Sequence, residues 1–204
     1  MRRRAGIITV AVLTAAVGVL GGCGGDDTGL PRPFADAVNV MQEAGGYAFS
    51  ATLSTVDNLN APVVIDGTFQ APDRVEQGIT RPGSPAIAMV LDGGSVFLKD
   101  PSSGKWVTQA AASTGAVDLR RSFAALSQAE GAKVEGSTAA FTLTGDAARA
   151  FVGDQVSGPV AVTATLGTVG LARITYQADL GGRSMRVTID YSAVGAAPAV
   201  TLPV

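Results

Sequence analysis

Hydrophobic and polar residues alternate with a period of two through much of the chain beyond Gly46. The stretch YAFSATLST shows this most clearly, because Tyr47, Phe49, Ala51 and Leu53 fall on one face and Ser50, Thr52 and Ser54 on the other. The same alternation recurs from Val63 to Phe69, Ala139 to Leu143, Val160 to Leu166 and Met185 to Tyr191. The pattern is typical of antiparallel strands with one apolar and one solvated face.

Turn-forming residues separate these strands. Asp100-Pro101-Ser102-Ser103-Gly104 predicts a hairpin inside FLKDPSSGKW, and DLGGRS (179–184) predicts another between two long strands near the C-terminus. Counting runs and turns gives roughly eleven strands, with no repeat of fixed period.

Three segments have a helical spacing of apolar residues instead. The first places Phe34, Val38 and Met41 on one face, with Pro33 in the first turn and Gly45-Gly46 at the end. The second, 117–130, carries Leu119, Phe123 and Leu126 as a stripe and stops at Gly131; the third, 146–152, turns Ala147, Ala150 and Phe151 inward. The second segment lies between two groups of strands, so we expect it to cover the open side of the sheet. The fold class is therefore α+β.

The N-terminus predicts export. Arg2, Arg3 and Arg4 precede an apolar run from Ala5 to Leu20, which has the form of a secretory signal peptide over residues 1–22. The run is also near the lower length limit of a spanning helix, so an uncleaved signal anchor is the alternative.

Leu20-Gly21-Gly22-Cys23 resembles the lipobox of bacterial lipoproteins. The resemblance implies a diacylglyceryl thioether on Cys23, cleavage before Cys23 and acylation of the new amine. The alternative is an ordinary secretion signal with an incidental cysteine. Two or three acyl chains would hold the chain at the membrane. Residues 23–33 then form a lipidated tether with a reach of roughly 15–20 Å.

Composition narrows the function. Removing the three arginines changes the formal charge from −2 to −5, and no basic cluster remains, which argues against nucleic acid as a partner. Cys23 is the only cysteine, so no disulfide is expected, and we expect one domain, 34–204, that is a monomer with a Val, Leu, Ile and Ala core.

Catalytic residues are scarce. The chain has no histidine, which removes the commonest general base. Ser102-Ser103-Gly104-Lys105 matches the S-x-x-K pattern of penicillin-recognising enzymes, but it falls in a predicted hairpin turn rather than at a helix start. We expect no catalytic residues, no cofactor and no metal site.

The order of motifs resembles a known family. A lipobox cysteine and short tether lead into a helix, GGYAFSATLST, DGTFQAPDRV (66–75), the hairpin GGSVFLKDPSSGKWV (93–107) and a last strand ending in VTLPV. This order is similar to that of the actinobacterial LppX and LprG lipoproteins, whose fold resembles the Lol carriers. The resemblance implies a half-open barrel of strongly curved antiparallel sheet, closed by helices around an apolar space for acyl chains. It also implies lipid or glycolipid as partner, anchoring on the extracytoplasmic face of the cell membrane, and an envelope transporter as a further candidate partner.

The inward positions are the candidate cavity lining. Ala51, Gly67, Ala139 and Ala164 are small and would leave volume for an acyl chain, although the same positions would also suit a filled core. The candidates are Phe49, Ala51, Leu53, Ile65, Phe69, Leu119, Phe123, Leu126, Phe141, Val162, Ala164, Val187 and Ile189. Two functions follow: a lipid or glycolipid carrier with a dry cavity, or a tethered interaction module with a packed interior that assists an envelope complex or sensor.

Overall fold

Eleven strands form one antiparallel sheet in the computed structural model, which describes residues 29–110 and 119–203. They are β1 (Gly46–Thr55), β2 (Asn58–Gln70), β3 (Arg74–Thr80), β4 (Ile87–Asp92), β5 (Ser95–Lys99), β6 (Trp106–Ala110), β7 (Glu130–Glu135), β8 (Thr138–Leu143), β9 (Val160–Leu166), β10 (Leu171–Leu180) and β11 (Arg183–Ser192). Their order is β6-β5-β4-β3-β2-β1-β11-β10-β9-β8-β7. Almost every strand therefore pairs with its neighbour in the chain, and the pairing of β1 with β11 joins the two halves.

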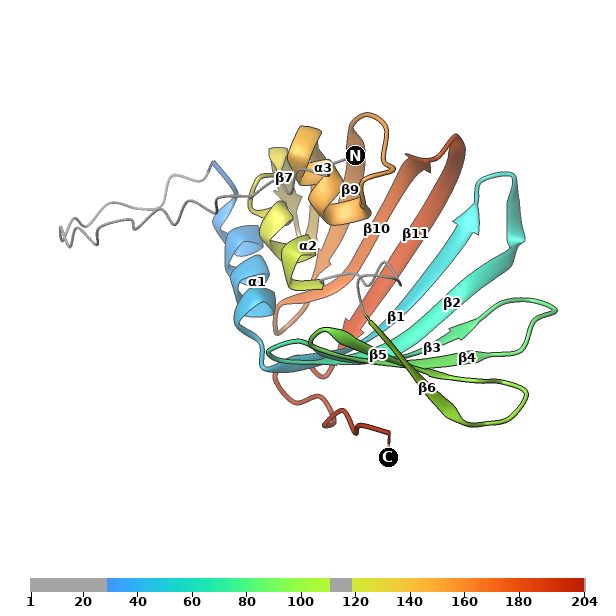
Figure 1. The fold of residues 1–204 in the computed structure, drawn as a ribbon. Coiled ribbons are helices and arrows are strands. Elements are labelled where there is room, and N and C mark those ends of the chain that lie inside the picture. The colour runs from blue at the N-terminus through green and yellow to red at the C-terminus, as the bar shows by residue number, and fades with distance from the viewer. Residues whose placement is uncertain (1–28, 111–118, 204) are drawn as a thin grey trace, which may run out of the picture.

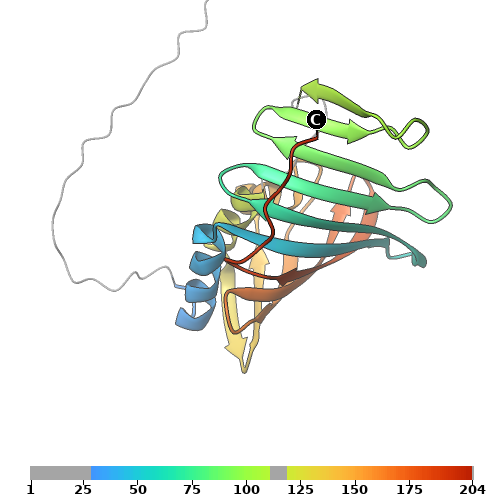
Figure 2. The same ribbon diagram turned by 90° about the horizontal axis from the view of Figure 1, so that it is seen from below.

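The sheet is strongly curved and open, with β6 and β7 as its edges (Figures 1 and 2). The predicted half-open barrel of antiparallel strands is confirmed. Both predicted hairpins are present, β5 to β6 through the Asp100 turn and β10 to β11 through Gly181-Gly182.

Three helices lie on the inner side of the sheet, gathered over the β7 to β10 end (Figure 1). They are α1 (Arg32–Glu43), α2 (Leu119–Leu126) and α3 (Gly145–Val152). Helix α1 contacts α2, β9 and β10, and α2 contacts α3. The predicted face of α1 is confirmed, since Phe34, Val38 and Met41 are all buried.

Helix α2 ends at Leu126, four residues before the predicted end at residue 130, and residues 117 and 118 lie outside the described residues. Its last turn tightens, with the amide groups of Ser127, Gln128 and Ala129 each donating to the carbonyl oxygen three residues earlier. Gly131, expected to stop the helix, lies instead in β7 at a φ of 61°, where the register with β8 shifts. A glycine that permits a bulge therefore has the same sequence signature as a helix cap.

Two further expectations are wrong. In α3 the buried residues are Ala147, Ala148 and Phe151, whereas Ala150 is exposed, because the helix turns by one residue relative to the predicted face. The VTLPV segment does not continue a strand. The chain after β11 crosses the outer face of the sheet, as Figure 2 shows, and the amide of Val200 donates to Gln70 Oε1 at 2.8 Å.

The core lies between the three helices and the inner face of the sheet. Phe34 of α1 stacks on Phe141 of β8 at 4.7 Å between ring centroids, and Phe123 of α2 meets Tyr47 of β1 at 5.6 Å. Burial of these rings fixes the helices to one half of the sheet.

The predicted signal peptide, Cys23 and the residues of the tether up to 28 lie outside the described residues. Among the described residues, no helix has the length and hydropathy needed to cross a membrane.

Candidate functional site

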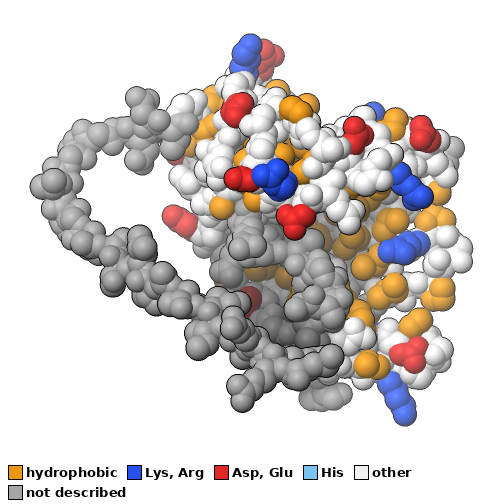
Figure 3. All heavy atoms as spheres, turned by 45° about the horizontal axis from the view of Figure 1, so that its top comes forward, with side chains coloured by type: hydrophobic (Ala, Val, Ile, Leu, Met, Phe, Trp, Pro, Cys, Tyr) orange, Lys and Arg blue, Asp and Glu red, His pale blue; other side chains and the backbone are white. Residues whose placement is uncertain are grey.

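The inner face of the other half of the sheet forms an apolar hollow. No described helix lies over β2 to β5, and beyond one buried row of side chains the apolar residues on the inner face there are only half-buried. Figure 3 shows hydrophobic side chains gathered where the molecule is hollowed. We define the hollow by nine half-buried residues on the inner face: Leu53, Val63, Ile65, Ile79, Ile87, Met89, Leu98, Met185 and Ile189.

Strand registers arrange these residues in rows that cross the sheet. One row runs Ile87, Ile79, Ile65, Ala51 and Ile189 across β4, β3, β2, β1 and β11. The second row to one side of it, from Val96 through Leu91, Val75 and Phe69 to Tyr47, is fully packed, with every member at most 8% exposed. This packed row closes the hollow at one end. Apolar surface becomes accessible from the adjacent row, which contains Met89 and Leu98.

Charge is confined to the outer face of these strands. Asp66, Arg74, Glu76, Asp92 and Lys99 are all the charged residues of β2 to β5, and their registers place every one on the face opposite the hollow. Arg74 and Asp92 pair there at 2.8 Å. A surface lined in this way gains free energy when apolar groups cover it and offers no counter-ion to a buried charge.

The polar side chains of Gln77, Tyr176 and Tyr191 border the hollow. Gln77 lies in a row with Gly67, Phe49 and Tyr191, one residue on each of β3, β2, β1 and β11. Burial raises the pKa of Tyr176 to about 12. Burial, together with the nearness of Tyr47 and Tyr176, raises the pKa of Tyr191 well above its ordinary value. Both phenols therefore stay neutral hydrogen-bond donors at physiological pH.

The structure divides the candidate cavity residues into three groups. Phe69, Phe123, Leu126, Phe141, Val162 and Ala164 pack together in the core on the side of the helices. Phe49, Ala51 and Val187 are buried at the floor between core and hollow, and Leu53, Ile65 and Ile189 belong to the hollow itself. The side chain of Leu119, like Cys23, lies outside the described residues. Contact between any of the candidate cavity residues and a ligand stays a prediction.

The small inward residues do not share one role. Ala139 and Ala164 are fully buried under the helices, and the ring of Phe49 occupies the space beside Gly67. Only Ala51 borders the hollow, between Ile65 and Ile189. Small size therefore serves helix packing at Ala139 and Ala164, whereas Ala51 adjoins the half-buried residues of the hollow.

Sequence reasoning missed much of the hollow, namely Ile79, Ile87, Met89 and Leu98, together with the bordering Gln77 and Tyr176. The alternation was hidden in two ways. Gln77 interrupts the apolar positions of β3, and β4 carries the apolar residues Ala88 and Val90 on its outer face as well. Val90 is 2% exposed although it lies on the outer face, so β4 reads as a continuous hydrophobic run. Pairing β3 with β4 as a hairpin would have shown which residues of the two strands share the inner face.

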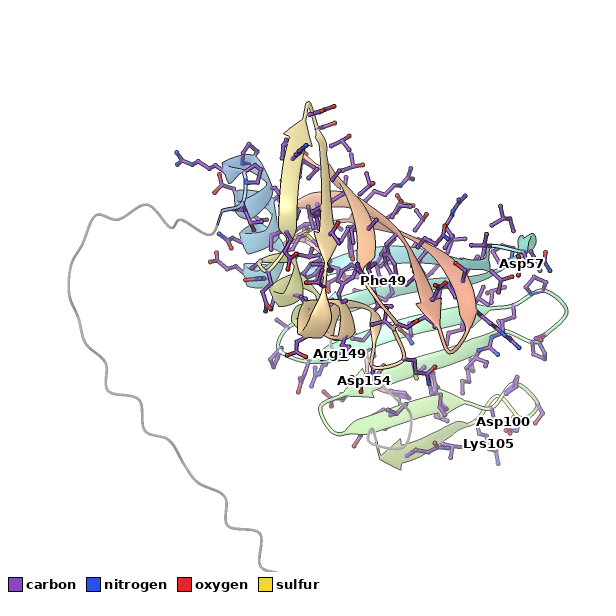
Figure 4. All side chains as sticks on the ribbon, turned by 90° about the horizontal axis from the view of Figure 1, so that it is seen from above. Phe49, Asp57, Asp100, Lys105, Arg149 and Asp154 are labelled. Carbon is purple, nitrogen blue, oxygen red and sulfur yellow. The ribbon has the colours of Figure 1, made fainter. Side chains whose placement is uncertain are left out.

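The S-x-x-K match has no catalytic geometry. The hydroxyls of Ser102 and Ser103 both donate to the carboxylate of Asp100, at 2.7 Å each, and these bonds lower the pKa of Asp100 to about 2. Figure 4 shows Asp100 and Lys105 at the hairpin tip, whereas Phe49 lies inside the fold. The residues build the turn, as Asx turns do. No cluster suited to a metal ion occurs in 29–110 or 119–203.

Solved structures with this fold include two mycobacterial lipoproteins. LppX of Mycobacterium tuberculosis aligns with a TM-score of 0.56 at 15% identity, over 86% of this chain and 100% of LppX. LprF of Mycobacterium bovis aligns with a TM-score of 0.51 at 15% identity, over 84% and 95% of the two chains. A LolA superfamily protein of Nitrosomonas europaea aligns at 0.41 with 11% identity, over 83% and 94%. The sequence matches no protein-family model and no curated protein. The LppX/LprG-type fold is thus confirmed.

Proposed function

We propose that this chain is a membrane-anchored lipoprotein that holds the acyl chains of a lipid or glycolipid in the hollow and carries them in the cell envelope. The single observation that carries the proposal is the row Ile87, Ile79, Ile65, Ala51 and Ile189. Its four isoleucines are half-buried and present aliphatic surface on β4, β3, β2 and β11, with the buried Ala51 between them on β1, while every charge of β2 to β5 lies on the other face.

The energetics of such a surface favour an aliphatic ligand. Each methylene that leaves water contributes about 0.8 kcal/mol, so a chain of eight to ten buried methylenes supplies roughly 6 to 8 kcal/mol before the cost of ordering. The strands β2 to β5 offer no charged side chain on the face of the hollow that would select a head group. We therefore expect affinity to rise with acyl chain length and to tolerate different head groups.

In the proposed function, acylation at Cys23 anchors the protein to the membrane. A tether of about ten residues would keep the hollow within a few nanometres of the bilayer from which a lipid is taken. An envelope transporter is the partner class that would pass lipid to or from such a carrier. We propose no catalytic step, because the Ser-Lys match builds a turn and the sequence has no histidine.

A pair of adjacent substitutions on β3 tests the hollow. Ile79 points into it and Thr80 points to the outer face, where it is exposed. The protein used is the chain from residue 24 onward, which contains every described element. Ile79→Glu places a carboxylate in the hollow and is expected to abolish binding of a fluorescent fatty acid. Thr80→Glu adds the same charge to the same strand and is expected to leave binding intact.

Equal binding by both variants, with both folded, would contradict the proposal. Failure of the unsubstituted protein to bind any acyl probe would favour the alternative, a tethered interaction module whose interior is simply packed.

A further inference from the structure

Tyr176 and Tyr191 lie on either side of Ile189 on the inner face of the sheet. Tyr191 is two residues further along β11 than Ile189, and Tyr176 of β10 faces Val187, two residues before it. Ile189 itself is a half-buried member of the hollow. The two phenols therefore flank one accessible aliphatic side chain.

Each ring is held from the side of the core. The ring of Tyr191 meets Phe123 of α2 at 5.5 Å and Tyr47 at 5.7 Å between centroids, and the ring of Tyr176 meets Phe151 of α3 at 5.2 Å. Phe123 and Phe151 are buried. Since both tyrosines are themselves only half-buried, their rings stand at the boundary between the packed core and the hollow.

The hydroxyls of Tyr176 and Tyr191 have no hydrogen-bonding role among the described residues. Neither hydroxyl has a hydrogen-bond partner in the described ranges 29–110 and 119–203, and neither is among their fully enclosed unsatisfied atoms. A phenol that is half-buried and open to an apolar space gains from an acceptor that arrives with a ligand.

We propose that Tyr176 and Tyr191 form a polar subsite that donates hydrogen bonds to the carbonyl oxygens of ester-linked acyl chains lying in the hollow. The inference rests on the proposed function, and it deepens it by naming the chemical class of the ligand. An ester carbonyl is neutral and accepts without donating, which matches two phenolic donors.

A charged head group fits this subsite less well. Ile189 pairs with Ala51 of β1 and Ile174 of β10, so a phosphate or carboxylate buried against it would meet aliphatic side chains in that row and no counter-ion. The ester region would therefore lie at the tyrosines, with the chains over the aliphatic row and the head group towards solvent.

Comparison of an ester with its ether tests the subsite. Dioctanoylglycerol and the diether dioctylglycerol share glycerol and alkyl chains, but only the first has carbonyl oxygens. The chain from residue 24 onward is expected to bind the ester more tightly, by about two- to tenfold for each hydroxyl engaged. Binding would be measured by native mass spectrometry and calorimetry.

Tyr176→Phe and Tyr191→Phe remove the hydroxyls and keep the rings. Together they are expected to abolish the preference for the ester and leave affinity for the ether unchanged. Thr52→Val, which removes a hydroxyl from the outer face of β1, serves as the control and is expected to preserve the preference. Thermal unfolding confirms that each variant is folded.

Two outcomes separate this inference from the proposed function. If ester and ether bind equally, and the Phe variants match the unsubstituted protein, the subsite is wrong and the carrier proposal stands. If neither compound binds, the hollow does not take acyl chains and both proposals fail.

Discussion

The ring of Phe49 lies over Gly67 of the adjacent strand, where a Cβ atom would meet Phe49 Cζ at 2.5 Å and the carbonyl oxygen of Glu76 at 2.6 Å. Phe49 and Gly67 face each other in the β1–β2 register, at the floor of the hollow. The absent side chain of Gly67 thus lets an aromatic ring cover the backbone, and the contact sets the depth of the floor.

This contact predicts that Gly67→Ala destabilises the fold. The added methyl group must displace Phe49 or the β3 strand, and such overpacking typically costs about 1–3 kcal/mol. Denaturant unfolding measures the loss. Gly78→Ala is the control, because a Cβ at Gly78 meets nothing within 4 Å and its φ is not positive. Equal stability of the two variants would show that Phe49 does not pack against Gly67.

Phe123 is predicted to be a closed-core residue. It is 1% exposed and contacts the rings of Tyr47 and Tyr191, so Phe123→Ala is expected to lower the free energy of unfolding by about 3–5 kcal/mol. Phe123→Leu keeps most of the volume and should cost less. A much smaller loss for Phe123→Ala, accompanied by weaker retention of lipid, would instead place Phe123 in the wall of a cavity.

The raised pKa of Tyr176 predicts a loss of stability in alkali. An unfolded tyrosine titrates near pH 10, whereas burial raises the pKa of Tyr176 to about 12. Between these values the unfolded chain has released a proton that the folded chain keeps, so stability falls as pH rises through the window. For Tyr176 alone the difference amounts to roughly 2–3 kcal/mol.

Urea unfolding at about pH 9 and about pH 11 captures roughly half of this loss, because pH 11 lies midway between the unfolded and folded pKa values. Tyr176→Phe has no proton to release and is expected to lose less stability between the two conditions. An identical loss in the variant would show that Tyr176 keeps an ordinary pKa in the fold.

Lipid attachment is predicted to depend on Cys23, since the sequence contains no other thiol. Cys23→Ala should abolish metabolic labelling with palmitate and leave an unprocessed precursor. Cys23→Ser, which cannot form the thioether, should behave in the same way. Normal labelling of either variant would refute the lipobox interpretation.

The number of strands and the two hairpins could be predicted from the sequence because they depend on local signals. Alternation in β1, β2, β8, β9 and β11 and the glycines between strands are visible without tertiary context. The end of α2 could not be predicted, since Gly131 gives the same signal whether it caps a helix or forms a bulge.

The hollow was harder to predict because it depends on what covers each face. Ala51 and Ala164 have the same inward orientation and similar neighbours in sequence, yet only Ala164 lies under α1 and the core cluster. Val90 is buried on the outer face, so an apolar residue in β4 does not by itself indicate the inner face of the sheet. Whether an inward residue is exposed depends on helices that are distant in the chain, and it therefore cannot be predicted from the local sequence.

Lipid extracted from the protein after purification from its own cell envelope tests the central claim most directly. The account predicts a stoichiometric acyl lipid with the unsubstituted protein, and with Thr52→Phe, which adds a ring to the outer face. Ala51→Phe, which adds the same ring to the floor of the hollow between Ile65 and Ile189, is predicted to remain folded and carry none. Equal amounts of lipid in all three proteins, or no lipid in any of them, would contradict the account.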